Sequence, residues 1–293
     1  MHLDFFDQPR EPGVTDMVRR DALEVEELEI DLLLEALHRR YGYDFRDYAR
    51  ASLRRKVRHL AATVGVAQVS DLIPRLLHEP ELFSSVVGAF ATPVTEMFRD
   101  PPFFKFVRES VVPHLRTWPF VRIWVAGCAT GEEVYSLAIL LKEEGIYERC
   151  TLFATDFVDP VLRSARDGIY PLRNMKTNST NYQRAGGRGT LSDYYHADYD
   201  SVIMDAGLRE NITFANHNLV SDGVFSEVHL ILCRNVLIYF NSALQKRVLD
   251  LFHASLLHGG FLALGSKESL RHGDFQDKFR ELESTWKVYR KAV

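Results

Sequence analysis

The spacing of apolar positions changes near residue 90. Before that point, apolar side chains recur at three- and four-residue steps, at Leu28, Leu32, Leu33 and Leu37 and again at Leu53, Val57 and Leu60. This period is typical of amphipathic helices, and no strand-like alternation interrupts it. Residues 21–90 are therefore predicted to form a small, all-α N-terminal domain.

Beyond residue 90, short apolar runs alternate with amphipathic stretches. These segments occupy residues 121–128, 132–144, 151–157, 159–166, 212–216, 228–233, 244–257 and 260–265. The alternation predicts an α/β domain over residues 91–293, with a mostly parallel sheet built from right-handed crossovers. A last apolar run, residues 285–290, is expected to close the sheet as an antiparallel edge strand. Between about residues 171 and 210 the alternation gives way to a polar, tyrosine-rich insert.

The N-terminus does not resemble a targeting segment. Residues 1–20 carry Asp, Glu and Pro where a secretory signal has an apolar core, so we expect a flexible leader there. No run approaches the roughly 20 consecutive apolar residues that a membrane helix needs. The 46% apolar and 26% charged residues are ordinary for a soluble protein. We therefore expect a cytoplasmic protein without membrane insertion.

The three cysteines do not suggest a metal site. Cys128, Cys150 and Cys233 lie in or beside apolar runs and lack the spacing of metal ligands. They fit buried, reduced thiols better than a disulfide framework. No structural or catalytic metal is predicted.

A glycine-containing turn follows the first predicted strand. Residues 126–131 read Ala-Gly-Cys-Ala-Thr-Gly and open directly into Glu132 and Glu133. Small residues let the backbone approach a ligand closely, but carboxylates in the first helical turn would repel the pyrophosphate of a dinucleotide. The turn suits a cationic ligand, and S-adenosylmethionine carries an ammonium and a sulfonium. Alternatively, both carboxylates only stabilise the helix dipole.

Two other strand ends carry polar residues. Asp156 ends the second strand, where α/β nucleotide folds hold the ribose hydroxyls with a carboxylate. Its alternative role is to cap the next helix, although Asp159 is better placed for that. Arg234, Asn235 and Tyr239 follow a later strand, beyond whose carboxyl end ligands bind in open α/β sheets. Alternatively, Arg234 only fixes a neighbouring loop and Tyr239 is a core aromatic residue.

Together these segments resemble a known family. Residues 94–99, 127–136, 154–156, 168–170, 218–219, 233–240 and 265–269 occur in the order and context of the CheR-type chemotaxis receptor glutamate methyltransferases. The resemblance covers residues 22–291. It implies a class I S-adenosylmethionine-dependent methyltransferase domain behind a helical N-terminal domain. It also implies transfer of the methyl group to receptor glutamates, with S-adenosylhomocysteine as the second product.

The resemblance implies roles for individual residues. Cofactor contacts are expected from the linker, the glycine turn and three strand ends, at Thr95, Arg99, Gly127, Glu133, Asp156, Asn218, Leu219, Cys233, Arg234 and Asn235. Within this set, Glu133 is expected to bind the methionyl amine, and Asn218 and Leu219 the adenine side. Arg99 and Tyr239 are expected at the methyl-transfer centre. The family often has Asn where this chain has Pro93, which removes a possible hydrogen bond to the cofactor.

A basic stripe is the candidate docking surface. Arg50, Arg54 and Arg58 recur at four-residue spacing with Arg55 beside them. Such a stripe is often just a solvated helix face, but it would speed association with acidic receptor helices. The net charge of −4 and the lack of interleaved aromatic residues disfavour nucleic acid. In relatives, a glycine-containing hairpin binds a receptor tether peptide. Residues 194–201 are few and lack glycine, so we expect docking without a tether. We also expect the protein to be a monomer.

Other functions remain as alternatives at this point. One alternative is a methyltransferase of a different signalling protein. Another is a regulatory module that binds S-adenosylmethionine or S-adenosylhomocysteine without transferring a methyl group. Retention of both Arg99 and Tyr239 favours an active enzyme. A nicotinamide oxidoreductase is disfavoured by Glu132 and Glu133, which occupy the position where such a fold binds phosphate.

Overall fold

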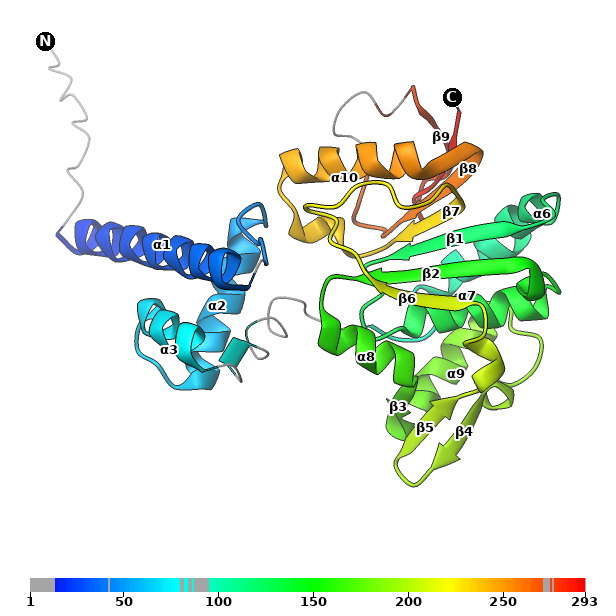
Figure 1. Ribbon diagram of the computed structural model, residues 1–293, viewed down its shortest axis with the longest axis horizontal. Coiled ribbons are helices and arrows are strands. Elements are labelled where there is room, and N and C mark those ends of the chain that lie inside the picture. The colour runs from blue at the N-terminus through cyan, green and yellow to red at the C-terminus, as the bar shows by residue number, and fades with distance from the viewer. Residues whose placement is uncertain are drawn as a thin grey trace, which may run out of the picture. The chain divides into compact units, whose positions relative to one another are not determined.

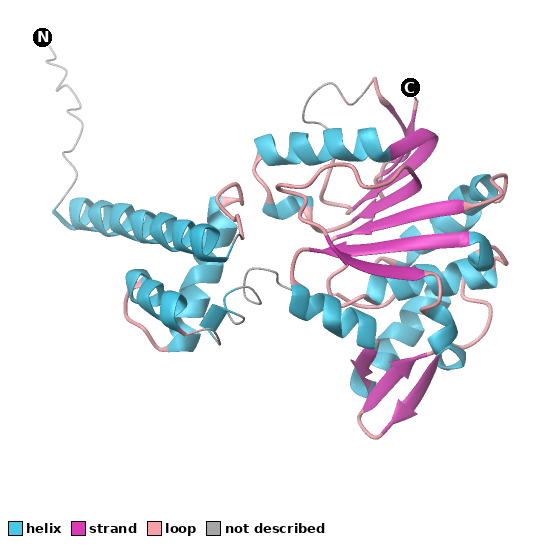
Figure 2. Ribbon diagram, viewed as in Figure 1, coloured by secondary structure: helices cyan, strands magenta, loops and turns pink. Residues whose placement is uncertain are grey.

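The protein consists of two compact units. The computed structural model describes residues 14–41, 43–79, 82, 83, 86, 95–270, 275 and 277–292, with no side-chain description for residues 14–22. Contacts within the chain separate Met1–Ala89 from Phe90–Val293. Figure 1 traces both units, and Figure 2 distinguishes the helical first unit from the mixed second one.

Helices form the first unit. They are α1 (Val14–Tyr41), α2 (Arg50–Val64), a 3-10 turn (Val69–Asp71) and α3 (Leu72–His78). Helix α1 begins inside the stretch expected to be a flexible leader, because residues 14–22 contain neither Gly nor Pro to stop it. Residues 1–13 lie outside the described part of the chain.

The buried face of α1 differs from the predicted one. Ile30, Leu33 and Leu37 are buried, whereas Leu28 and Leu32 are 59% and 51% exposed. All five fit a three- and four-residue pattern, so periodicity alone could not separate the inner stripe from an apolar outer one. The remaining core of this unit comes from the following helices, at Leu53, Val57, Leu60, Leu72 and Leu76.

A seven-stranded sheet organises the second unit. Its order is β6-β2-β1-β7-β8-β10-β9. The strands are β1 (Val121–Ala126), β2 (Cys150–Asp156), β6 (Ile212–Asn216), β7 (Val228–Cys233), β8 (Leu256–Leu264), β9 (Phe279–Glu283) and β10 (Val288–Lys291). Pairing is parallel from β6 to β8 and antiparallel at β10 and β9. The predicted parallel sheet with an antiparallel edge is therefore confirmed, but β9 was not anticipated.

Helices cover both faces of this sheet. They are α5 (Pro101–Phe106), a π-helical segment (Val107–Val111), α6 (Val112–Leu115), α7 (Glu132–Glu143), α8 (Asp159–Asp167) and α10 (Ser242–Ser255). Successive residues of β1 point to opposite faces: Ile123 and Val125 join the core that contains the α7 residues, while Trp124 contacts Phe252 of α10 at a ring distance of 5.3 Å. The carboxyl ends of the parallel strands therefore share one edge, which carries the polar segments singled out above.

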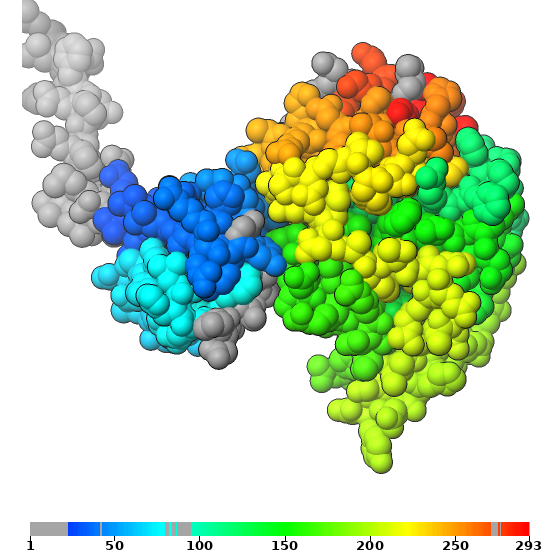
Figure 3. All heavy atoms as spheres, viewed as in Figure 1, coloured from blue at the N-terminus to red at the C-terminus, as the bar shows by residue number. Residues whose placement is uncertain are grey.

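The polar insert folds into a small lobe. Strands β3 (Ile169–Pro171), β5 (Ser201–Met204) and β4 (Tyr195–Asp198) form an antiparallel sheet in that order, beside helix α9 (Met175–Arg184). Figure 3 shows the β4–β5 hairpin projecting from the surface of the second unit. Tyr199 at its tip is 96% exposed with a φ of 49°.

A buried ion network ties this lobe to α7. Arg108 donates to Glu143 at 2.6 Å and to Glu144 at 2.7 Å, and Arg188 of the insert donates to Glu144 at 2.6 Å. Tyr182 of α9 donates to Glu143 as well. The side chains of Arg108 and Glu144 are 9% and 5% exposed, so the insert is fixed by charges that solvent screens weakly.

No single helix in the described residues is long and apolar enough to cross a membrane. One bent pair, Arg50–Val64 with Val69–His78, meets the length and composition test with a bend of 64°.

We predict that Arg108→Ala lowers the free energy of unfolding by about 3–5 kcal/mol, because it removes the cation paired with the buried Glu143 and one of the cations paired with Glu144. The matched control is Lys105→Ala on the neighbouring helix, whose pair with Glu109 spans 3.9 Å and is exposed; it should cost under about 1 kcal/mol. Urea unfolding followed by circular dichroism measures both values. Equal losses would show that the network is not a structural anchor.

Candidate active site

The glycine turn after β1 adopts a backbone that few residues tolerate. Gly127, Ala129 and Gly131 have φ values of 71°, 47° and 96°. The amides of Gly127 and Cys128 both donate to the carbonyl of Thr155 in β2, at 2.8 and 2.9 Å. A Cβ atom at Gly127 would lie 2.5 Å from Cγ2 of Val236. Glycine is therefore required at this position for both conformation and space.

Asp156 is held in place by two backbone amides at the end of β2. Its Oδ2 accepts from the amide of Ala129 at 3.0 Å, and its Oδ1 accepts from the amide of Val158 at 3.1 Å. Val158 is the N-cap of α8 and the helix begins at Asp159, so Asp156 spans the turn and the strand end instead of capping the helix. Burial raises the pKa of the Asp156 carboxyl.

Arg234, directly after β7, joins three distant segments. Its Nη1 donates to Oε2 of Glu133 at 2.7 Å, and its Nη2 donates to Oδ2 of Asp100 at 2.6 Å. Nη1 also donates to the carbonyl of Arg99 at 3.3 Å. The guanidinium lies 4.0 Å from the ring centroid of Phe103, and the side chain is 1% exposed. The alternative role considered for Arg234, fixing a neighbouring segment, is thus present in the structure.

Glu133 lies at the centre of this charge arrangement. Burial raises the pKa of its carboxyl, whereas Arg234 and, more weakly, Arg99 act to lower it. The neighbouring Glu132 accepts from the Thr130 hydroxyl at 2.6 Å, and burial raises its pKa too. Two carboxylates in the first turn of α7 keep this helix N-terminus unsuited to phosphate.

Glu268 is a site residue whose role was not predicted. Its Oε2 accepts from the amides of Gly265 at 2.5 Å and Asn235 at 3.1 Å, and its Oε1 accepts from the amide of Ile238 at 3.3 Å. The residue is 5% exposed, and burial raises its pKa. It shapes the loop that leads to Tyr239. The available signals were its place just after an apolar strand and within residues 265–269, one of the segments that carry the resemblance.

The loop after β6 adjoins the Asp156 strand end. The amide of His217 donates to the carbonyl of Asp156 at 3.1 Å. Asn218 accepts from the amide of Val220 at 2.9 Å, which forms a tight turn, and Leu219 is 7% exposed. The predicted adenine-side residues are therefore beside the predicted ribose residue.

The remaining predicted residues fall into two groups. Arg99 and Tyr239 are both half-buried, in the linker before α5 and in the 3-10 turn Leu237–Tyr239, and Thr95 is half-buried near the start of the second unit. Cys128 and Cys233 are buried, and burial raises the pKa of both thiols well above the ordinary value, so neither is a thiolate nucleophile. Pro93 lies outside the described residues.

The basic stripe has partners within the first unit. Arg50 pairs with Asp31, Arg54 with Glu27, and Arg58 with Glu26 at 2.5 Å. These acidic residues lie on α1, so the charge of the basic stripe is largely neutralised by ion pairs between α1 and α2. Arg55 is exposed. The spacing of the arginines predicted the basic stripe but not its pairing with acidic residues of α1.

Among the residues that the structure describes, no cluster of three or more His, Cys, Asp or Glu side chains is arranged to hold a metal ion.

We predict that Gly127→Ala destabilises the protein more than Gly145→Ala. Both glycines have positive φ, 71° and 67°, but a Cβ at Gly145 meets nothing within 4 Å. The control should cost about 1–2 kcal/mol for the left-handed backbone alone, and Gly127→Ala a further ~1–3 kcal/mol for the clash with Val236. Thermal unfolding and urea titration compare the two, and equal effects would exclude a close approach at Gly127.

Comparisons with known proteins identify the family of this chain. Residues 93–288 match the family described as "CheR methyltransferase, SAM binding domain", and residues 28–91 match "CheR methyltransferase, all-alpha domain". A Pseudomonas putida protein with the provisional name methyltransferase Cher3 is 50% identical over 266 residues, which cover 91% of this chain and 97% of that protein. The predicted resemblance and fold class are confirmed.

More distant relatives carry chemotaxis names or none. A chemotaxis protein methyltransferase of Borreliella burgdorferi is 26% identical over 257 residues, covering 83% of this chain and 88% of that protein. An uncharacterized 104.1 kDa protein of Rhodobacter capsulatus is 32% identical over 257 residues, covering 84% of this chain but 26% of that protein. The chain thus belongs to the CheR family of S-adenosylmethionine-dependent chemotaxis protein methyltransferases.

Proposed function

We propose that the protein transfers the methyl group of S-adenosylmethionine to glutamate side chains on the cytoplasmic helices of a chemoreceptor-type protein, forming glutamate methyl esters. The supporting observation is a strand edge that carries two partly buried carboxylates, Asp156 and Glu133, with Arg99 close to Glu133, in a member of this family. The reaction would take place in the cytoplasm, where the substrate helices lie.

The donor set fits S-adenosylmethionine. Asp156 is aimed by two amides and keeps lone pairs for the cis-diol of a ribose. Glu133 has one oxygen on Arg234 and a second oxygen for an ammonium group. Gly127 and Gly131 would let the backbone of the glycine turn approach the cofactor closely. Asn218 and Leu219 would border its adenine. When bound, the cofactor supplies an electrophilic methyl group on a sulfonium.

Positioning, not proton transfer, is the task of this chain's residues. A glutamate carboxylate is already ionised at pH 7, so no general base is needed. Alignment of nucleophile and methyl group can lower the barrier by about 7–11 kcal/mol. We assign to Arg99 the orientation of the incoming carboxylate through charge-assisted hydrogen bonds, and to Tyr239 the wall beside the methyl group. Too strong a grip by Arg99 would weaken the nucleophile.

The docking surface is part of the same proposal. Arg50, Arg54 and Arg58 are engaged by carboxylates of α1, so an acidic receptor helix would have to compete for these cations, and exposed Arg55 offers the simplest first contact. Exposed ion pairs are worth only about 0–1 kcal/mol each. Carboxylates of a receptor helix could therefore replace those of α1 at little cost in free energy. This surface remains a candidate for a chemoreceptor and not for nucleic acid.

We predict that Arg99→Ala lowers the rate of methyl transfer about 10²–10³-fold, the usual effect of removing one charge-positioning group. Affinity for S-adenosylhomocysteine should change much less, because Asp156 and Glu133 remain. Arg99→Lys should restore part of the rate. The exposed Arg184→Ala variant serves as the control. The assay follows labelled methyl groups onto receptor cytoplasmic fragments.

The stability of the product distinguishes the proposal from its alternatives. A glutamate methyl ester releases its label in mild alkali, whereas an N-methyl product does not. Alkali-stable label would contradict glutamate as the acceptor. Binding of S-adenosylhomocysteine without any transfer would favour a regulatory module, and transfer to another signalling protein alone would replace the receptor as substrate.

We predict that, on acidification, cofactor affinity is lost at a higher pH than it would be if Asp156 had the pKa of an exposed Asp. Only the ionised Asp156 accepts both ribose hydroxyls, and burial raises its pKa, so it takes up a proton at a higher pH than in the unfolded chain. Binding should therefore strengthen as pH rises through this pKa and then level off. Asp156→Asn should bind weakly with a flatter pH profile in calorimetric titrations; an unchanged profile would remove Asp156 from the cofactor site.

A further inference from the structure

A basic pocket lies at the end of the sheet opposite the candidate active site. It has a volume of about 600 Å³ and is lined by Trp118, Leu257, His258, Gly259, Arg280 and Arg290, among others. Trp118 precedes β1, and residues 257–259 begin β8. Since β1 and β8 run parallel, these residues sit at the amino ends of the strands, away from Asp156 and Arg234. A volume in this range is typical of small-molecule sites.

Two arginines that line this pocket occupy directly opposed positions on neighbouring strands. Arg280 of β9 and Arg290 of β10 are direct partners in the antiparallel register. Like charges in directly opposed positions destabilise a sheet. Within the described residues, no carboxylate forms an ion pair with either arginine. The fold thus maintains a repulsive pair that an anion would relieve.

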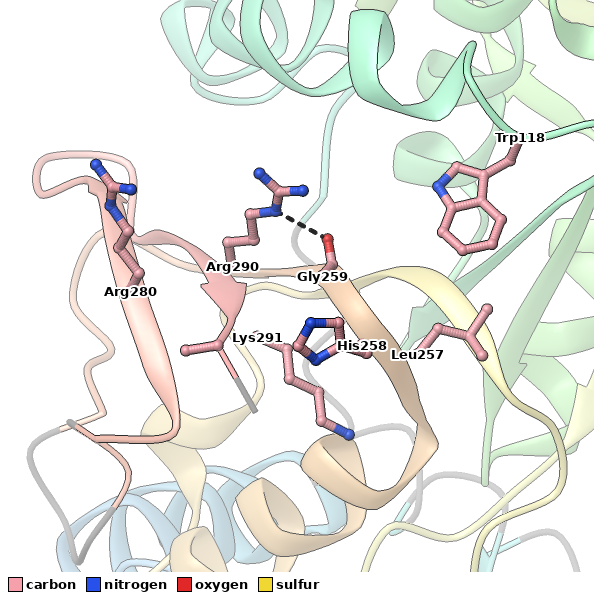
Figure 4. Close-up of a pocket in the computed structure, with 8 residues that line it drawn as sticks. Trp118, Leu257, His258, Gly259, Arg280, Arg290 and Lys291 are labelled. Atoms are coloured by element: carbon pink, nitrogen blue, oxygen red, sulfur yellow. Dashed lines mark hydrogen bonds between the residues drawn. The ribbon is translucent and has the colours of Figure 1, made fainter.

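Arg290 is fixed in a way that leaves its terminal nitrogens for a ligand. Its Nε donates to the carbonyl of Gly259 at 3.1 Å, and its guanidinium lies 5.5 Å from the ring centroid of Phe261. Figure 4 shows the guanidinium groups of Arg290 and Arg280 projecting to the same side, with the Trp118 indole across the opening. A planar guanidinium held at Nε presents its other donors to an oxyanion without further ordering.

The opposite wall of the pocket suits a flat ring. Trp118 is 41% exposed, and the edge contact of its indole with His229, at a ring distance of 4.8 Å, limits its movement. Leu257 adds an apolar surface below it. We propose that this pocket binds a nucleoside phosphate, with the phosphate between Arg280 and Arg290 and the base against Trp118. This second site is independent of the cofactor and of the methyl acceptor.

The test is calorimetric titration of the full chain with ATP, in saturating S-adenosylhomocysteine so that the cofactor site is filled. One ATP should bind per chain, and more weakly as salt rises. Arg280→Ala and Arg290→Ala should each weaken binding at least about tenfold, while the exposed Arg184→Ala on α9 of the insert should not. Trp118→Ala should weaken ATP but not inorganic phosphate.

Thermal unfolding supplies a second measurement, in which Arg280→Ala should change stability in opposite directions, relative to the wild type, without and with ATP. Without ATP, Arg280→Ala should raise the melting temperature because it removes the like-charge contact; with ATP, only the wild type should gain stability. Absence of ATP binding, binding that Arg290→Ala leaves unchanged, or a lower melting temperature for Arg280→Ala without ATP would each overturn the proposal. Equal affinity for phosphate and ATP would overturn the base contact with Trp118.

Discussion

The buried guanidinium of Arg234 is the interaction on which the active-site edge depends. It is 1% exposed and takes one carboxylate from the linker, Asp100, and one from α7, Glu133. A buried cation that loses a partner costs about 3–5 kcal/mol, so the linker and the glycine turn must be assembled on β7 together. Phe103 covers the guanidinium and excludes water from it. Arg234 lies more than 100 residues along the chain from both of its carboxylate partners, which explains why no local pattern reveals the contact.

The ion pairs of Arg234 also fix the residues around them. Arg234 acts to lower the pKa of Glu133 against the burial that raises it, and it holds the backbone of Arg99 by its carbonyl. On the far side, Glu268 fixes the loop between Asn235 and Tyr239 through backbone amides. The two candidate catalytic residues thus sit on segments anchored by buried charges. Such anchoring is what a reaction that relies on alignment requires.

Local patterns in the sequence predicted the parallel part of the sheet and its antiparallel strand β10, and they singled out polar residues at its carboxyl edge. The glycine turn, Asp156 and the polar end of β7 could be recognised because strand ends in α/β folds are where ligands bind. Three features could not be predicted. The inner face of α1 was ambiguous since Leu28 and Leu32 share the apolar period. The pairing of Arg54 with Glu27 and the contacts of Glu268 are tertiary, and neither leaves a periodic trace.

The most direct test of this account is a double-mutant cycle between Arg234 and Glu133, read by calorimetric affinity for S-adenosylhomocysteine. Arg234→Met and Glu133→Gln should each weaken binding, and the double variant should bind about as well as the worse single variant, with a coupling energy of at least ~1 kcal/mol. Losses that simply add would contradict the account, because they would mean that Arg234 does not act through Glu133.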